Sequence, residues 1–300
     1  MLMAGSALLA SCGGAHNRAL NEAAAQPAVA TPNSPQADTD KSDSLAKFRT
    51  KLMAGLGGAS ELSLAAKGWG PGLGPMLGGS PALESLTELD VSDNDLGVEG
   101  ARALARSSHL AALRDLEIGG NDIGDDGAIA IAHAQFLAGL ETLNASGNSI
   151  GATGTQALLQ GSAKKLSSLD LSMNPIGGPG ASAIGHAQLP LTALYLLGCE
   201  IGPSGIQELT QSKHLSALRV LALSGNNLGD AGTQALANAA GLANLTTLDL
   251  CANGVGDAGA LALAQSPYLR KLKMLELFGN EIGARGAVAL KKRFGKGLHI

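Results

Sequence analysis

Apolar and polar positions along the chain follow one pattern that returns about every 27 residues. In each copy, leucines separated by one residue predict a short strand with a single buried face, because strand side chains alternate in direction. A glycine-containing turn follows, and then an Ala/Leu-rich run of helical character, such as GARALA at 100–105. The pattern therefore predicts a series of strand–turn–helix units.

One polar position recurs in nearly every unit and fixes the register of the repeat. The steps between these marker positions are 27, 27, 26, 25, 27, 27 and 27 residues, and the markers are Asn94, Asn121, Asn148, Asn174, Cys199, Asn226, Asn253 and Asn280. A further step back reaches Lys67, in a degenerate first copy. Leucine stands five residues before the marker in all nine copies, from Leu62 to Leu275. The repeats therefore span roughly residues 59–292.

The consensus L-x-x-L-x-L-x-x-N, followed by an apolar residue and then G-x-x-G-A-x-A-L-A, resembles the leucine-rich repeat family. Within that family it is similar to the ribonuclease-inhibitor-like subtype, which has a helix in every repeat. The resemblance implies an α/β solenoid of about nine repeats, with a parallel sheet on the concave face and short helices on the convex face. It also implies that the marker asparagines stack as a ladder. Strands lie about 4.8 Å apart and helices roughly 8–10 Å, so the stack must bend.

A dinucleotide-loop motif, G-x-G-x-x-G at Gly254, Gly256 and Gly259, lies inside the eighth copy. A strand before it and a helix after it would suit a phosphate-binding loop. However, Gly256 and Gly259 recur at the same offsets in copies without the motif, whereas Gly254 occupies a variable position. We therefore interpret the motif as a coincidence of the repeat and expect no cofactor site.

Both ends of a solenoid expose leucines and need caps. Residues 43–58 are predicted to form the N-terminal cap helix, with Leu45, Phe48, Leu52 and Leu56 along one side and Trp69 assisting. Residues 293–300 are predicted to form the C-terminal cap, including a short edge strand at 298–300. Residues 13–42 have almost no large apolar side chains and are predicted to be a disordered tether.

The first twelve residues end in Leu-Ala-Ser-Cys, which resembles the lipobox of bacterial lipoprotein signal peptides. The resemblance implies cleavage before Cys12 and attachment of lipid to its thiol. No Lys or Arg precedes the apolar run, which departs from the usual signal-peptide pattern. A disordered terminus that carries these four residues by chance is the alternative.

Composition gives little support for an enzyme or a nucleic-acid-binding protein. The net charge is −4, charged residues make up 15% of the chain and aromatic residues 2%. No nucleophile–base arrangement or carboxylate pair is evident, and we expect no catalytic residues and no metal ligands. The histidines recur at repeat offsets, as His109 and His214 do, without ligand spacing to a Cys or carboxylate. We predict that the histidines occupy surface or helix positions.

Three positions of each copy, at six, four and two residues before the marker, are predicted to face away from the leucine core. In the first half of the chain they include Asp90 and Glu117 among other acidic residues. From the sixth copy onward they become more apolar, and include Tyr195, Leu197, Val220, Ala222, Cys251, Met274 and Phe278, with Asp249 and Glu276 interspersed. Exposed apolar patches commonly mark partner sites. Tolerance of these side chains on an exposed sheet is the alternative.

These expectations combine into a monomeric, non-catalytic scaffold that binds an unknown protein and is anchored to a bacterial cell envelope by lipid on Cys12. A secreted effector that acts on host proteins is the second hypothesis, although nothing resembles the F-box segment of similar effectors. A GTPase-activating protein is a remote third, because one such family shares this repeat subtype. We expect no nucleic-acid partner, and membrane contact only through the lipid.

Overall fold

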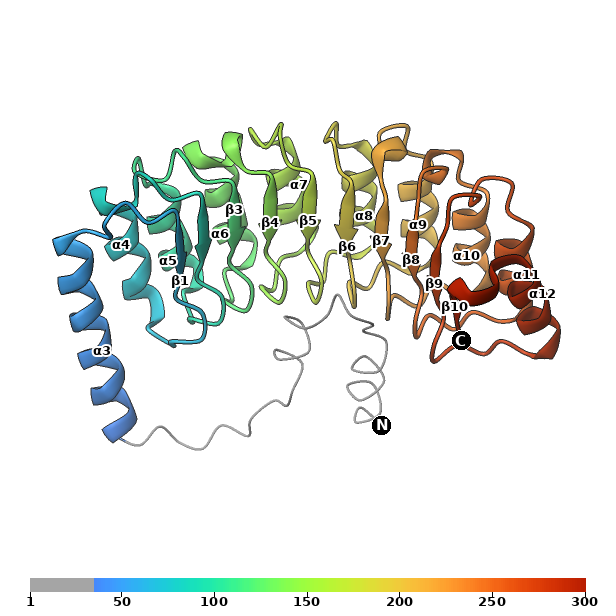
Figure 1. Cartoon of the computed structure of the whole chain (residues 1–300), viewed down its shortest axis with the longest axis horizontal. Helices are drawn as coiled ribbons and strands as arrows, with labels where there is room; N and C mark the ends of the chain where they lie inside the picture. The colour runs from blue at the N-terminus through green and yellow to red at the C-terminus, as the bar shows by residue number, and fades with distance from the viewer. Residues whose placement is uncertain (1–34) are drawn as a thin grey trace.

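The computed structural model describes residues 35–300. Within this range ten parallel strands form one open sheet in chain order (Figure 1). Each strand is followed by a turn and a helix, and neighbouring copies pair with the same register, Leu89 opposite Leu116 and Leu116 opposite Leu143. The fold is the predicted leucine-rich repeat solenoid. The strands are β1 (Glu61–Ser63), β2 (Glu88–Asp90), β3 (Asp115–Glu117), β4 (Thr142–Asn144), β5 (Ser168–Asp170), β6 (Ala193–Tyr195), β7 (Val220–Ala222), β8 (Thr247–Asp249), β9 (Met274–Glu276) and β10 (Leu298–His299).

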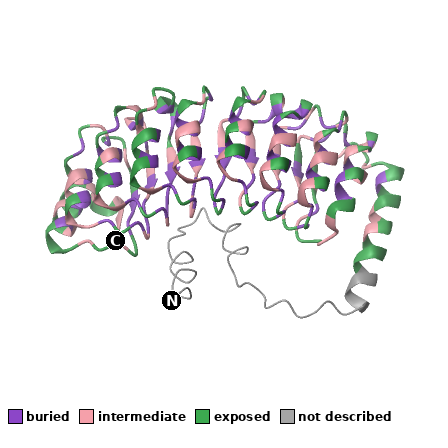
Figure 2. Cartoon of the chain, turned by 180° about the vertical axis from the view of Figure 1, so that it is seen from behind, coloured by how far each residue is buried: buried purple, intermediate pink, exposed green. Residues whose placement is uncertain are grey.

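The helices form a second layer that covers one face of the sheet, as the view from behind shows (Figure 2). Their spacing in the chain repeats that of the strands, so each helix packs on the helix of the copies beside it. They are α4 (Leu73–Gly78), α5 (Gly97–Ala105), α6 (Gly124–Ala132), α7 (Ala152–Gln160), α8 (Gly177–His186), α9 (Gly202–Thr210), α10 (Gly229–Ala237), α11 (Asp257–Gln265) and α12 (Ala284–Phe294). Several copies add a short 3-10 turn before the strand, as at Leu215–Ala217 and Ala240–Leu242.

The core lies between the sheet and the helices and consists mainly of leucines contributed by every copy. Leu116, Leu194, Leu221, Leu248 and Leu275 are fully buried at the central strand position. Because each copy places the same leucines against its two neighbours, the core is continuous from end to end. The register predicted from the asparagine markers is therefore the register of the folded chain.

The marker asparagines form the expected ladder, and Asn121 illustrates its geometry. Its Nδ2 donates to the carbonyl oxygens of Val91, Ile118 and Gly119 at 3.0, 2.9 and 3.0 Å. Its Oδ1 accepts from the backbone N–H of Asn94 at 3.0 Å. One buried side chain thus satisfies several backbone groups where the chain leaves the sheet, and it joins two copies.

The ladder is interrupted once between residues 94 and 280, at the sixth copy, where Cys199 replaces asparagine. Its thiol donates to the carbonyl oxygen of Leu171 at 3.2 Å, which keeps one ladder bond to the preceding copy. In place of Oδ1, the Cys199 sulfur is a weak acceptor for the backbone N–H of Asn174, and Ile176 N–H donates to the carbonyl oxygen of Asn174 at 2.8 Å. The ladder bond between the fifth and sixth copies is therefore weaker than the ladder bonds between the other copies.

The two glycines of each copy have different roles at the start of the helix. Gly124, the first, has a φ of +60°, a conformation that side chains disfavour. Gly205, the second, allows α8 and α9 to approach closely, since a Cβ there would lie 2.6 Å from the Cα of Gly178. The second glycine is thus a packing requirement between neighbouring helices.

A helix lies at the N-terminal end of the solenoid and a short strand at its C-terminal end, and the helix differs from the prediction at both bounds, since it ends at Ala54 and not at 58. The N-terminal helix α3 spans Pro35–Ala54 and so begins eight residues before the predicted start at 43. Phe48 stacks on Trp69 at 5.2 Å between ring centroids, and Trp69 Nε1 donates to Ser44 Oγ at 2.8 Å. The tether was predicted from a lack of large apolar side chains, a criterion that does not detect an exposed helix. The rest of the predicted tether, residues 13–34, and the lipobox at Cys12 lie outside the described residues. At the other end, β10 pairs with β9 as expected.

Candidate functional site: the open face of the sheet

The face of the sheet opposite the helices carries the candidate site, and we call it the open face. Its side chains come from the positions six, four and two residues before each marker. Because the strands pair in register, equivalent residues form rows that run along the whole molecule. One such row reads Asp170, Tyr195, Ala222, Asp249, Glu276 and His299 from β5 to β10.

The N-terminal part of the open face is acidic. Asp90, Asp115 and Glu117 are half-buried on β2 and β3. Burial raises the pKa of Glu117, a hydrogen bond from Asn144 lowers it, and the charges of Asp90, Asp170 and Asp115 raise it further. The carboxylates therefore lie near enough to interact, and this half presents a negative surface.

Asp170 marks the end of the acidic part and is itself buried, with 9% of its surface exposed. Its Oδ1 accepts from the backbone N–H of Ser172 at 2.8 Å, an arrangement that Asp90 and Asn144 repeat in their own copies. Burial raises the pKa of Asp170, and hydrogen bonds from Ser172 lower it. Tyr195 lies opposite Asp170 on β6. Its own burial raises the pKa of Tyr195, and the charge of Asp170 raises that pKa further.

The C-terminal part is more apolar, and five of the seven predicted apolar residues are accessible on the open face. Tyr195, Leu197 and Val220 are half-buried, whereas Met274 and Phe278 are 39% and 37% exposed. Phe278 lies against the ring of His299, at 6.4 Å between ring centroids. These residues extend over β6 to β9 and form an elongated surface rather than an enclosed pocket.

Some predicted outward residues are not available to a partner, which corrects the prediction. Cys251 is fully buried, and Ala222 and Glu276 are 8% and 6% exposed. Ala222, for example, lies between the longer side chains of Tyr195 and Asp249, which are about 4.8 Å away on either side and cover it. Strand alternation correctly predicted the face toward which these side chains point, but it could not predict that neighbouring side chains would cover them.

A group of potential metal ligands that the sequence analysis did not identify is also present here. Asp249, Cys251 and Glu276 each offer one ligand atom, and these atoms all lie within 4.8 Å of one another. Sequence reasoning sought ligands near the histidines and so missed three residues that are joined only by strand pairing. His109 likewise has a carboxylate partner from another copy, Glu84 Oε1 at 3.1 Å from its Nδ1.

Cys199 and the G-x-G-x-x-G segment at 254–259 are structural parts of the repeat scaffold. The pKa of the Cys199 thiol is raised to about 12, mainly by burial. The thiol therefore stays protonated and hydrogen-bonded in the ladder. In the G-x-G-x-x-G segment, the backbone N–H groups of Gly256 and Gly259 both donate to Asp230 Oδ1, at 2.8 and 2.7 Å. A carboxylate of the preceding copy thus occupies the place that a phosphate would need.

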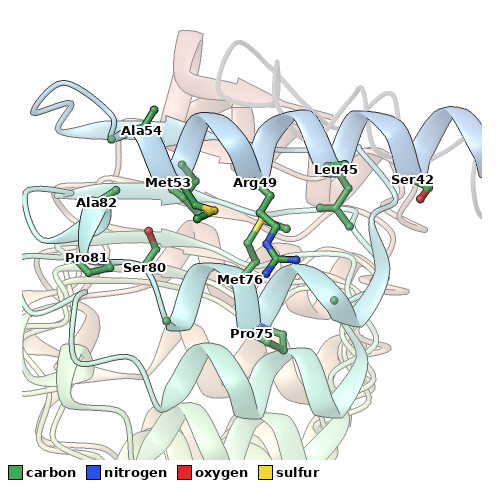
Figure 3. A pocket seen from close by; sticks show the side chains of 15 residues that line it. Ser42, Leu45, Arg49, Met53, Ala54, Pro75, Met76, Ser80, Pro81 and Ala82 are labelled. Atoms are coloured by element: carbon green, nitrogen blue, oxygen red, sulfur yellow. The ribbon is translucent and has the colours of Figure 1, made fainter.

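A groove of about 1060 Å³ lies apart from the open face, between α3 and the first copy (Figure 3). Its lining includes Leu45, Leu52, Met53, Pro75 and Met76, with Arg49 as the charged side chain. Met53 is 81% exposed. The groove is the seam along which the cap helix covers the first repeat, and it gathers few polar groups.

A comparison with protein families agrees with this architecture. A family described as "Leucine Rich repeat" matches six segments of the chain, residues 82–105, 109–132, 162–185, 214–237, 241–264 and 268–291. Each segment contains a strand and most or all of the following helix. Among solved structures, an internalin from Listeria monocytogenes str. 4b F2365 is similar, with a TM-score of 0.46 and 19% identity over 73% of this chain and 68% of that one. No curated protein matches the sequence significantly.

Proposed function

Because the chain is built of leucine-rich repeats, we propose that it is a non-catalytic scaffold that binds a partner protein through the open face of its sheet. The observation that carries this proposal is the apolar surface over β6 to β9, above all exposed Met274 and Phe278. Exposed apolar side chains gathered on one face of a soluble domain favour an interface. Tyr195 adds an aromatic residue of a type enriched among binding hot spots.

The shape of the surface favours a protein over a small molecule. Small ligands are usually held in concave pockets that cover most of their surface. Here the apolar residues lie along β6, β7 and β9, with Thr247 and Asp249 of β8 between them, and the large groove lies elsewhere, under α3. An elongated partner segment or a folded domain could contact several rows at once.

The acidic half supports a partner with basic residues at one end. Asp90 and Glu117 lie on β2 and β3, so a partner seated on the apolar strands would meet them only if it spans the sheet. Charges at such a periphery act mainly on the association rate and its salt dependence. Binding is thus expected to slow with added salt even when the apolar contacts are unchanged.

The experiment compares capture of binding partners by the full chain and by matched variants. Tyr195→Ala and Phe278→Ala should weaken partner binding, at least one by more than about 1 kcal/mol, without altering the fold. Val288 provides a control, since it is an exposed apolar residue, 69% exposed, on α12 of the helix face. If Val288→Ala abolishes binding while both aromatic variants bind normally, the partner docks on the helices.

For location, the proposal is attachment to a bacterial cell envelope through lipid on Cys12. No helix within residues 35–300 is both long and apolar enough to cross a bilayer. Incorporation of labelled palmitate into the full chain, lost in Cys12→Ser, is the expected result. Equal labelling of the two proteins would contradict the anchor. Recovery in the culture medium without label would favour the alternative, a secreted effector, and a GTPase assay would test the remote activating-protein alternative.

A further inference from the structure

The cluster of Asp249, Cys251 and Glu276 on β8 and β9 has the composition and closeness of a metal site. Asp249 and Cys251 are two residues apart and therefore point to the same face of the sheet. Glu276 lies opposite Asp249 in the strand register. One ligand atom from each residue lies within 4.8 Å of the other two. Ligands around one zinc ion lie roughly 3.3–3.5 Å apart, so small side-chain rotations would suffice.

The electrostatics of the cluster favour a cation. Glu276 is 6% exposed, and burial of a carboxylate is costly unless its charge is compensated. Asp249 lies opposite Glu276 in the strand register, so two carboxylates are held side by side. Among the described residues, Lys and Arg form their side-chain ion pairs elsewhere, as Arg102 does with Glu99 and Asp126. A divalent ion would relieve the repulsion between the two carboxylates.

A second feature beside the cluster is independent of the carboxylates. The hydroxyl of Ser224 is fully buried and has no hydrogen-bond partner among the described residues. Gly225 N–H donates to the carbonyl oxygen of Cys251 at 2.9 Å, which places Ser224 across from Cys251 on the open-face side. In the fifth copy, the equivalent Ser172 uses its hydroxyl on Asp170 and Leu197. A water or hydroxide bound to an ion in the cluster would give Ser224 the partner it lacks.

We propose that Asp249, Cys251 and Glu276 bind one divalent metal ion of the zinc class. A thiolate ligand selects a borderline or soft ion such as Zn²⁺ over Mg²⁺ or Ca²⁺, and carboxylate oxygens are accepted ligands of zinc. On binding, the Cys251 sulfur forms the bond to the ion and its proton is released to solvent. Three protein ligands leave a fourth position for water.

Cobalt titration of the full chain tests the site, because thiolate bound to Co²⁺ gives an absorption band that carboxylates do not. All proteins carry Cys12→Ser, so that the remaining thiols are Cys199 and Cys251. One equivalent of Co²⁺ should produce the band, and Zn²⁺ should displace it. Cys251→Ser should abolish the band, and Glu276→Gln should weaken affinity about tenfold or more.

The controls separate loss of the site from loss of the fold. Serine already occupies the position of Cys251 in the fifth and seventh copies, as Ser172 and Ser224, so Cys251→Ser should retain its circular dichroism and melting temperature. Cys199→Ser removes a thiol far from the carboxylates and should leave the band unchanged. Absence of a band in the parent protein, or its persistence in Cys251→Ser or full strength in Glu276→Gln, would overturn the proposal. The measurement needs no partner, so it is independent of the proposed protein interface.

Discussion

At the scale of single residues, the ladder position has the largest structural effect in this chain. Asn148 donates to the carbonyl oxygens of Ile118 and Ser146 at 2.9 and 3.1 Å and accepts from the N–H of Asn121 at 3.0 Å. Cys199 keeps the donating half of these interactions, but its sulfur is a weaker acceptor for the N–H of Asn174 than Oδ1 would be. Each buried backbone group left without a partner costs roughly 1–3 kcal/mol. The ladder therefore has one position at which stability can be gained.

Cys199→Asn is expected to stabilise the protein by about 1 kcal/mol, because its Oδ1 would accept from the N–H of Asn174. Urea unfolding followed by circular dichroism measures the change. Cys199→Ala is the control and should destabilise, since it removes the thiol that donates to Leu171. A loss of stability in Cys199→Asn equal to that in Cys199→Ala would show that the fifth and sixth copies cannot accommodate the ladder.

The buried carboxyl group of Asp170 gives a prediction for pH. Its pKa is raised above the ordinary value of 3.8, so its protonated form is favoured in the folded chain and it stabilises the fold at low pH. That stability is lost as the pH rises through the raised value. Asp170→Asn should therefore raise the melting temperature at pH 7, and it keeps an acceptor for Ser172, as Asn144 does for Ser146.

The advantage of Asp170→Asn should disappear once the pH falls below the ordinary value of 3.8, where both side chains are neutral. Glu141→Gln, at an exposed position, provides the comparison. A variant with a lower melting temperature than the parent at pH 7 would mean that the Asp170 charge is stabilised by its hydrogen bonds more than burial opposes it.

At the scale of elements, the three-residue strands depend on the leucine at their centre. Leu221 on β7 is fully buried, and its strand neighbours pair with β6 and β8 in the same register. Leu221→Ala should cost about 2–5 kcal/mol of unfolding free energy. Val220→Ala on the same strand is the control, because Val220 is half-buried on the open face and should cost less. A change within roughly 0.5 kcal/mol for Leu221→Ala, as is typical of surface sites, would contradict the register.

The elements were predictable from the sequence because period and spacing act within one copy. The strand, turn and helix of each copy, and the buried position of residues such as Leu221, can be predicted from residues only a few positions apart in the chain. The metal-ligand cluster was not predictable in this way, since Glu276 reaches Asp249 only through pairing of β8 with β9. The covering of Cys251 by its neighbours depends on side chains in adjacent rows. The start of α3 at Pro35 was missed because that part of the helix has no apolar stripe.

At the scale of the whole molecule, the chain is a series of similar units whose stability depends on intrinsic and nearest-neighbour contributions. The open face changes character between Asp170 on β5 and Tyr195 on β6. The same junction has the shortest step between markers, 25 residues, and a sulfur stands where the other copies offer Oδ1 to the preceding copy. The chemistry of the surface and of the ladder therefore changes at one place.

We expect this junction to divide the molecule into two cooperative units. In a one-dimensional array, a weaker junction lets the segments on its two sides open separately. Native-state hydrogen exchange should then show two plateaus of protection, one for the copies before Cys199 and one for those after it. The amide of Asn174 should exchange faster than that of Asn121, which donates to Asn148 Oδ1 at 3.0 Å. A partner that spans both halves would clamp the junction and merge the two plateaus, so exchange at Asn174 would report how far along the sheet a bound partner extends.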